Sequence, residues 1–125
     1  MIYETQEQAQ QACREWQERL YLRDWDIRAK ICRQEFMPRP DIMAHVNCVY
    51  PSKQALIKLL DPIDYPQDAE WEQDHEQSLV HELLHLHCWG FSATDATSPE
   101  GIAEDQAVDA LARALVALKK AGDAR

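Results

Sequence analysis

The segment from Leu79 to Trp89 constrains the fold more than any other part of the chain, because it is apolar nearly all round when drawn as a helix. A helix of that kind is buried by its neighbours over most of its circumference. We therefore predict a buried central helix over residues 71–89, ending at Gly90 in a left-handed C-cap. The rest of the 125 residues must pack around it, which is enough chain for one domain spanning residues 1–125.

Helical spacing and strand alternation predict the remaining elements. A helix is expected over residues 4–21, and Ser98 followed by Pro99 marks the start of a last helix that reaches about residue 121. Strand-like alternation or a short apolar run occurs in three segments, residues 25–31, 42–50 and 55–60. We expect the third of these strands to pair with the second. The fold class is then α+β, with an N-terminal helix, a three-stranded sheet, a buried central helix and a C-terminal helix.

The composition narrows the possible partners. A net charge of −9 repels nucleic acid and anionic membranes, so we expect neither as a partner. No run approaches about eighteen apolar residues, and the N-terminus lacks the basic and apolar regions of a secretory leader, so we expect a cytoplasmic protein. The four cysteines form no close pair, which favours reduced thiols and argues against a cysteine-based zinc site.

The central helix carries the motif most suggestive of chemistry, His81-Glu82-Leu83-Leu84-His85. Histidines four residues apart lie one turn from each other on the same face, so both imidazoles can reach one metal ion. A zinc ion lowers the pKa of a bound water, and a carboxylate beside that water can take its proton and pass it to a leaving amine. We therefore predict Zn²⁺ as cofactor, His81 and His85 as its ligands and Glu82 as general base.

A third protein ligand is expected at a catalytic zinc, and the last helix is its predicted source. Glu104 is the first choice because it heads a stripe expected to face the core, where an acid needs a partner. The stripe consists of Glu104, Ala107, Val108, Leu111, Leu115 and Leu118. Asp105, next to the stripe, remains the alternative ligand, and Asp109 could accept a hydrogen bond from a ligand histidine.

The other histidines are poorer ligand candidates. A third histidine six residues after His85 would complete a metzincin pattern, but Phe91 holds that position. His87 points away from the face of His85, since the two are two residues apart on the helix. His45, on a predicted strand, and His75, near the helix start, are expected to be surface or substrate-facing groups.

With these residues in place, the chain resembles gluzincin-type metallopeptidases, especially their minimal single-domain and phage-associated members. Residues 79–86 carry the resemblance most specifically, and the strands and residues 104–112 add to it. It implies a zincin-like fold, an edge strand lining the substrate cleft, and a glutamate ligand on the following helix, which maps onto Glu104. Gluzincins often have an acid or amide four residues after that ligand. Val108 stands there and Asp109 comes one residue later, which keeps Asp105 open as the ligand.

The motif and the resemblance together predict hydrolysis of peptide bonds in a peptide or protein substrate, bound as an added strand at the sheet edge. A second donor would stabilise the oxyanion. Its candidates are His45, Tyr50, Tyr65 and His75. One alternative keeps the zinc without catalysis, as a regulatory or interaction module, and another is a helical interaction domain with no metal.

Overall fold

The computed structural model describes residues 1–92 and 95–124, and these form a small α+β fold. Their helices are α1 (Gln6–Arg19), α2 (His75–Cys88) and α3 (Pro99–Asp123), and their strands are β1 (Asp26–Cys32), β2 (Ala44–Val49) and β3 (Gln54–Leu60). Every helix and strand predicted from the sequence is present, with ends that shift by a few residues.

The three strands form one mixed sheet in the order β1-β3-β2. β1 runs parallel to β3, which requires the chain to cross over between them, whereas β2 is antiparallel to β3. The expected pairing of the second and third strands is therefore confirmed, with Val46 opposite Ile57. β2 lies at one edge of the sheet. Its outer side borders the cleft of the candidate site described below.

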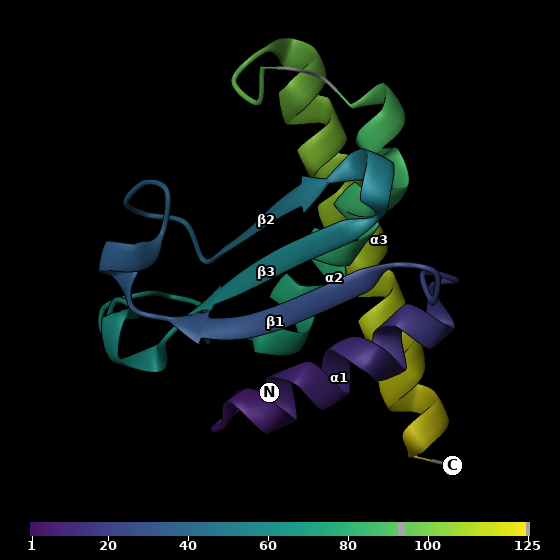
Figure 1. Ribbon diagram of the computed structural model, residues 1–125. Helices are drawn as coiled ribbons and strands as arrows, with labels where there is room; N and C mark the ends of the chain where they lie inside the picture. Colours follow the sequence, from purple (N-terminus) through teal and green to yellow (C-terminus); the bar gives the residue numbers. More distant parts are fainter. Residues whose placement is uncertain (93–94, 125) are drawn as a thin grey trace.

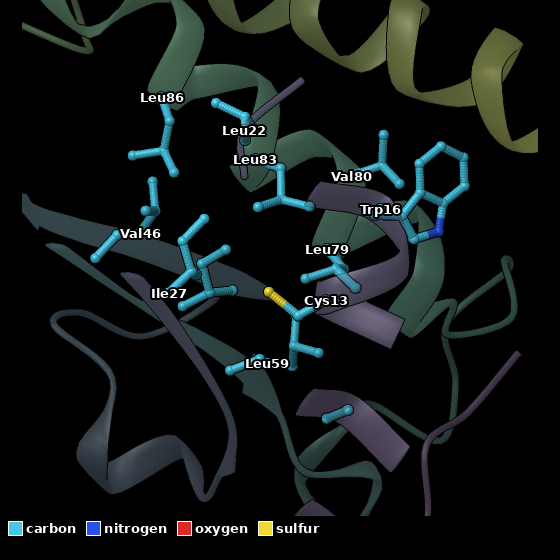
Figure 2. Packing of buried hydrophobic residues seen from close by; sticks show 14 of the residues in the cluster. Cys13, Trp16, Leu22, Ile27, Val46, Leu59, Leu79, Val80, Leu83 and Leu86 are labelled. Carbon is cyan, nitrogen blue, oxygen red and sulfur yellow. The ribbon is translucent and has the colours of Figure 1, made fainter. Parts of the chain in front are cut away.

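The helices cover one face of the sheet in two layers, as Figure 1 shows. α1 packs along β1 and α2 along β2 and β3, while α3 lies behind α2 on the side away from the sheet. The core forms where these layers meet (Figure 2). Ile57 and Leu59 of β3 belong to one cluster with Leu79 and Leu83 of α2, and all four are fully buried. The predicted burial of the central helix is confirmed on this side.

α2 begins later and ends differently than the sequence predicts. Its first residue is His75, because the Asp74 side chain accepts a hydrogen bond from the Gln77 N–H at 3.1 Å and so caps the helix. The predicted left-handed cap at Gly90 is wrong: no glycine among the described residues has a positive φ. The helix passes instead into a 3₁₀ turn over Trp89–Phe91, which tightens its last turn.

The predicted orientation of α3 is only partly right. Leu111 and Leu118, placed on the core-facing stripe from the sequence, are 57% and 69% exposed. The buried side of α3 carries Gly101, Val108, Ala112 and Val116, of which Val108 belongs to the predicted stripe, and Leu115 of that stripe is partly buried against the core. The helix is rich in alanine on several faces, so the position of its leucines does not decide which face packs on α2. Small residues allow α3 to approach α2 closely.

Two remaining predictions concern cysteines and membranes. The four cysteines are free thiols, of which Cys13 is buried and the others are half-buried. In the described part of the chain, no helix combines the length and the apolar character needed to cross a bilayer.

Candidate metal centre

His81 and His85 project from one face of α2 toward the first half of α3. Their ring centroids lie 5.0 Å apart. The Nε2 atoms of both rings approach the same oxygen, Oδ1 of Asp105, at 2.9 Å for His81 and 3.2 Å for His85. Within the described ranges these three residues form a group whose ligand atoms all lie within 4.8 Å of one another. Two nitrogens and one carboxylate oxygen thus converge on one point.

A second ring of polar groups holds the Nδ1 sides of the two imidazoles. Asp109 Oδ1 lies 3.1 Å from His81 Nδ1, and Glu104 Oε2 lies 3.3 Å from His85 Nδ1. The Asp109 carboxylate is itself fixed by Arg113, whose Nε donates to it at 2.9 Å. The hydroxyl of Ser92 donates to Glu104 at 2.6 Å. Each histidine is therefore oriented by a carboxylate that is oriented in turn, an arrangement usual around metal ligands.

Carboxylates outnumber the two imidazoles in this cluster, and they shift the pKa values of the groups around them. Burial acts to lower the pKa of His81, but the nearby carboxylates of Glu82, Asp105 and Asp109 outweigh it and raise that pKa above its ordinary value. For the carboxyl group of Asp109, burial alone would raise the pKa. The hydrogen bond from His81 and the charge of Arg113 outweigh burial and lower the pKa below its ordinary value. Four carboxylates, including Glu104, thus surround two imidazoles.

Glu82 lies beside this group on α2 and is almost fully buried, with 9% of its surface exposed. Burial raises the pKa of its carboxyl group, an effect that His81 and His85 partly oppose. Within residues 1–92 and 95–124, no hydrogen bond or ion pair reaches the carboxylate of Glu82. Its oxygens are not among the fully enclosed side-chain atoms that lack a partner, which fits their position at the cleft that Glu82 lines.

A cleft of about 1140 Å³ opens over these residues. One wall is the edge strand β2 with the segment before it, from Ile42 to Val46. The opposite wall is the first half of α3, and the floor is α2 with His81, Glu82 and His85. An extended chain lying in the cleft would therefore run beside β2 and over the two histidines.

Of the candidate oxyanion donors, His45 lines the cleft, whereas Tyr50, Tyr65 and His75 are not among its lining residues. His75 is fully buried, contrary to the prediction of a surface or substrate-facing group; it accepts from the Tyr3 N–H at 3.0 Å and lies 2.8 Å from the Leu60 carbonyl. The Tyr65 hydroxyl donates to the carbonyl of Trp71. His45, which precedes the buried Val46 on β2, belongs to the cleft wall opposite α3.

Tyr50 and His87 are also directed away from the cluster. Tyr50 packs at a tilt against Trp25, with ring centroids 6.2 Å apart, and His87 Nε2 lies 2.6 Å from the carbonyl of Leu20.

The sequence analysis missed three supporting residues. Gln77 and Arg113 both contact Asp109, and Ser92 contacts Glu104. Gln77 stands one turn before His81, and Arg113 one turn after Asp109, so helical spacing could have indicated both. Ser92 lies in a loop, and no pattern in the sequence points to it.

Comparison with known proteins adds no further constraint. No protein-family model, no curated protein and no solved structure matches the chain. The resemblance to gluzincins therefore depends on the residues described above.

The donor set suits a divalent metal ion. Ionised Asp105 and Asp109 only accept hydrogen bonds, so both contacts of His81 are hydrogen bonds when His81 carries a proton on each nitrogen. With a metal ion at Nε2, a neutral His81 can keep Nδ1–H for Asp109, which is the usual state of a ligand imidazole. Two imidazoles and a carboxylate match the ligand set of catalytic zinc sites.

Proposed function

We propose that this chain is a zinc-dependent peptidase with a zincin-like active site. The observation that carries the proposal is the convergence of His81 Nε2 and His85 Nε2 on Asp105, beside the buried and unpartnered carboxylate of Glu82. His81, His85 and Asp105 would hold the ion. Glu104, the ligand expected from the sequence, lies on the Nδ1 side of His85 and would orient that ring instead.

The bound zinc would supply Lewis acidity toward a substrate carbonyl and a water molecule. Glu82 acts as general base: its free carboxylate accepts a proton from water and delivers it to the leaving amine. The raised pKa of Glu82 suits this exchange, because a base that must also return the proton works best near the ambient pH. Asp109 and Glu104 keep the two imidazoles in the required tautomer and orientation.

The substrate would be an extended peptide segment that adds to the outer edge of β2 by main-chain hydrogen bonds. Such binding positions a peptide bond over the histidines without a deep pocket, which suits a chain of 125 residues. Of the four candidate donors named from the sequence, His45 lines the cleft wall, so the oxyanion would depend on the metal and on His45 as second donor.

The test combines metal analysis with a peptide library. The zinc-loaded protein should contain one equivalent of zinc and cleave peptides. Glu82→Gln should keep the zinc and lose cleavage by about 10²-fold or more. His81→Ala should lose both.

Glu72→Gln is the matched control, because Glu72 is exposed on the segment before α2 and should leave zinc and cleavage unchanged. A protein that binds zinc but cleaves no peptide would favour the non-catalytic module. A protein that binds no zinc would refute both.

A further inference from the structure

α3 has a second apolar face, directed away from the molecule. Ala107, Ala110, Leu111, Ala114, Ala117 and Leu118 are all exposed. At about 100° per residue they occupy roughly one third of the helix circumference. The charged residues between positions 107 and 118, Asp109 and Arg113, both lie outside that third. We call these six residues the outer face of α3.

This outer face is unusual for a surface helix. A helix at the edge of a domain normally has an apolar side toward the core and a charged side toward water. α3 already buries Val108, Ala112 and Val116 against α2, and it is the layer farthest from the sheet (Figure 1). Yet its opposite side carries leucines exposed by 57% and 69%. A helix that is apolar on both sides has the pattern of a helix packed on both sides.

The spacing along the outer face is self-complementary. Ala107, Leu111, Ala114 and Leu118 repeat at intervals of four, three and four residues, which is a heptad seam. In two antiparallel copies related by a two-fold axis between residues 112 and 113, Leu111 meets Ala114 of the second copy and Leu118 meets Ala107. Each leucine then lies opposite an alanine, so large and small side chains alternate and the helices can approach closely.

The charge distribution of α3 favours the same orientation. Residues 99–110 contain four acids and no base, whereas residues 111–123 contain three bases and one acid. Antiparallel packing brings the acidic half of each helix beside the basic half of the other, and it also pairs the helix dipoles favourably. Parallel packing would bring like charges together. Both the heptad spacing and the charge distribution indicate that the partner covering the outer face of α3 is a second copy of this chain.

We propose that the outer face of α3 is a two-fold dimer interface, in which two α3 helices pack antiparallel through Leu111 and Leu118. Asp105 and Asp109 lie on the opposite side of the helix, so the dimer leaves the cleft and the histidine cluster open. The proposal is independent of the metal and of catalysis.

Sedimentation velocity over about 1 µM to 1 mM protein tests the association. The mass should rise from the 14.5 kDa of one chain toward twice that value. Leu111→Glu with Leu118→Glu should weaken dimerisation by about a hundredfold or more while leaving the fold and any zinc binding intact, since both side chains are exposed. Ile63→Glu, a control at an equally exposed apolar position, should dimerise like the parent chain.

Single cysteines test the orientation. Ala114→Cys should give a disulfide-linked dimer under mild oxidation, because residue 114 lies next to its own copy across the axis. Ala107→Cys should not, because its two copies would lie roughly 16 Å apart along the helices at 1.5 Å per residue. The parent chain, with its four native thiols, gives the background.

A mass that stays at 14.5 kDa throughout would overturn the proposal and point to a different partner. If the double variant Leu111→Glu, Leu118→Glu still dimerised like the parent chain, the proposed interface would be wrong. Equal cross-linking at positions 107 and 114 would overturn the antiparallel arrangement.

Discussion

At the scale of single residues, the main question is which acid of α3 would bind the proposed metal ion. Asp105 and Glu104 are sequence neighbours, yet they lie on different sides of the imidazoles. Asp105 faces both Nε2 atoms, whereas Glu104 lies near Nδ1 of His85. In the proposed site Asp105 is therefore a ligand and Glu104 orients the His85 ring. The metal affinities of variants at the two positions can distinguish these roles.

We predict that Asp105→Asn weakens zinc binding more than Glu104→Gln does. Loss of an orienting carboxylate typically costs about 10- to 100-fold in metal affinity, so Glu104→Gln and Asp109→Asn should fall in that range. Loss of a charged ligand should exceed it. Competition titration with a chelating dye gives the three affinities. The reverse order, with Glu104→Gln the more damaging, would restore Glu104 as the ligand expected from the sequence.

His75 supplies a second prediction at this scale. Burial lowers its pKa below the ordinary 6.5, and its neutral ring accepts from the Tyr3 N–H, an interaction that a proton on Nδ1 would destroy. Because the folded state takes up this proton less readily than the unfolded chain, His75 favours folding above pH 6.5 and destabilises the fold as the pH drops below that value.

Urea unfolding of the metal-free protein at pH 7.5 and 5.5 measures the effect. The parent chain should lose more stability between these values than His75→Gln does, because the variant lacks this titration. Both proteins share the remaining titratable groups, so the difference between their pH dependences isolates His75. Equal losses would show that His75 is protonated as readily in the folded state as in the unfolded chain.

At the scale of elements, the start of α3 must lie close to the segment before it. A Cβ atom built on Gly101 would lie 2.3 Å from the carbonyl oxygen of Asp95 and 2.8 Å from Cα of Ala96. These are backbone atoms, which cannot move aside as a flexible side chain could. Gly101 also lines the cleft, one turn before Asp105, so its lack of a side chain fixes the position of the turn of α3 that carries the proposed ligand.

We predict that Gly101→Ala destabilises the protein by roughly 1–3 kcal/mol, the cost typical of overpacking, and weakens zinc binding as the turn shifts. Gly122→Ala is the matched control, since nothing lies within 4 Å of its added methyl group. That variant should be neutral or more stable by up to about 1 kcal/mol, because alanine favours a helix. Denaturant unfolding and zinc titration of both variants provide the comparison, and equal behaviour of the two would contradict the close approach.

The elements were more predictable from the sequence than their contacts. Alternation in β1 and β2, and the all-round apolar character of α2, are local patterns, and the structure has those elements. The i, i+4 spacing of His81 and His85 is equally local, and it brings the rings together as expected. The rotation of α3 is not local. Its alanines allow either side to pack, and the choice depends on the fit to α2. The prediction of Leu111 and Leu118 in the core failed for that reason.

At the scale of the whole molecule, the proposed metal centre joins the two helical layers, α2 and α3, to each other. His81, Glu82 and His85 belong to α2, and Asp105 and Asp109 to α3. Without a metal ion, this end of α3 is held by the contacts of His81 and His85 with Asp105 and of His81 with Asp109, which depend on protonation of the imidazoles. The opposite end of α3 is held by a different interaction, an ion pair between Lys119 and the buried Glu76 at 3.3 Å. Metal removal should therefore loosen one end of α3 and spare the other.

We predict that chelation lowers the melting temperature of the zinc-loaded protein. Zinc at about 100 times its dissociation constant should add about 2.7 kcal/mol to the free energy of unfolding, since it binds the folded state. His81→Ala should show no such zinc-dependent shift. Hydrogen exchange locates the change: amides near Asp105 should lose protection on chelation, whereas those near Lys119 should keep it, because the Glu76 pair still anchors that end. Uniform loss of protection along α3 would mean that the helix docks as one unit, held by the metal over its whole length.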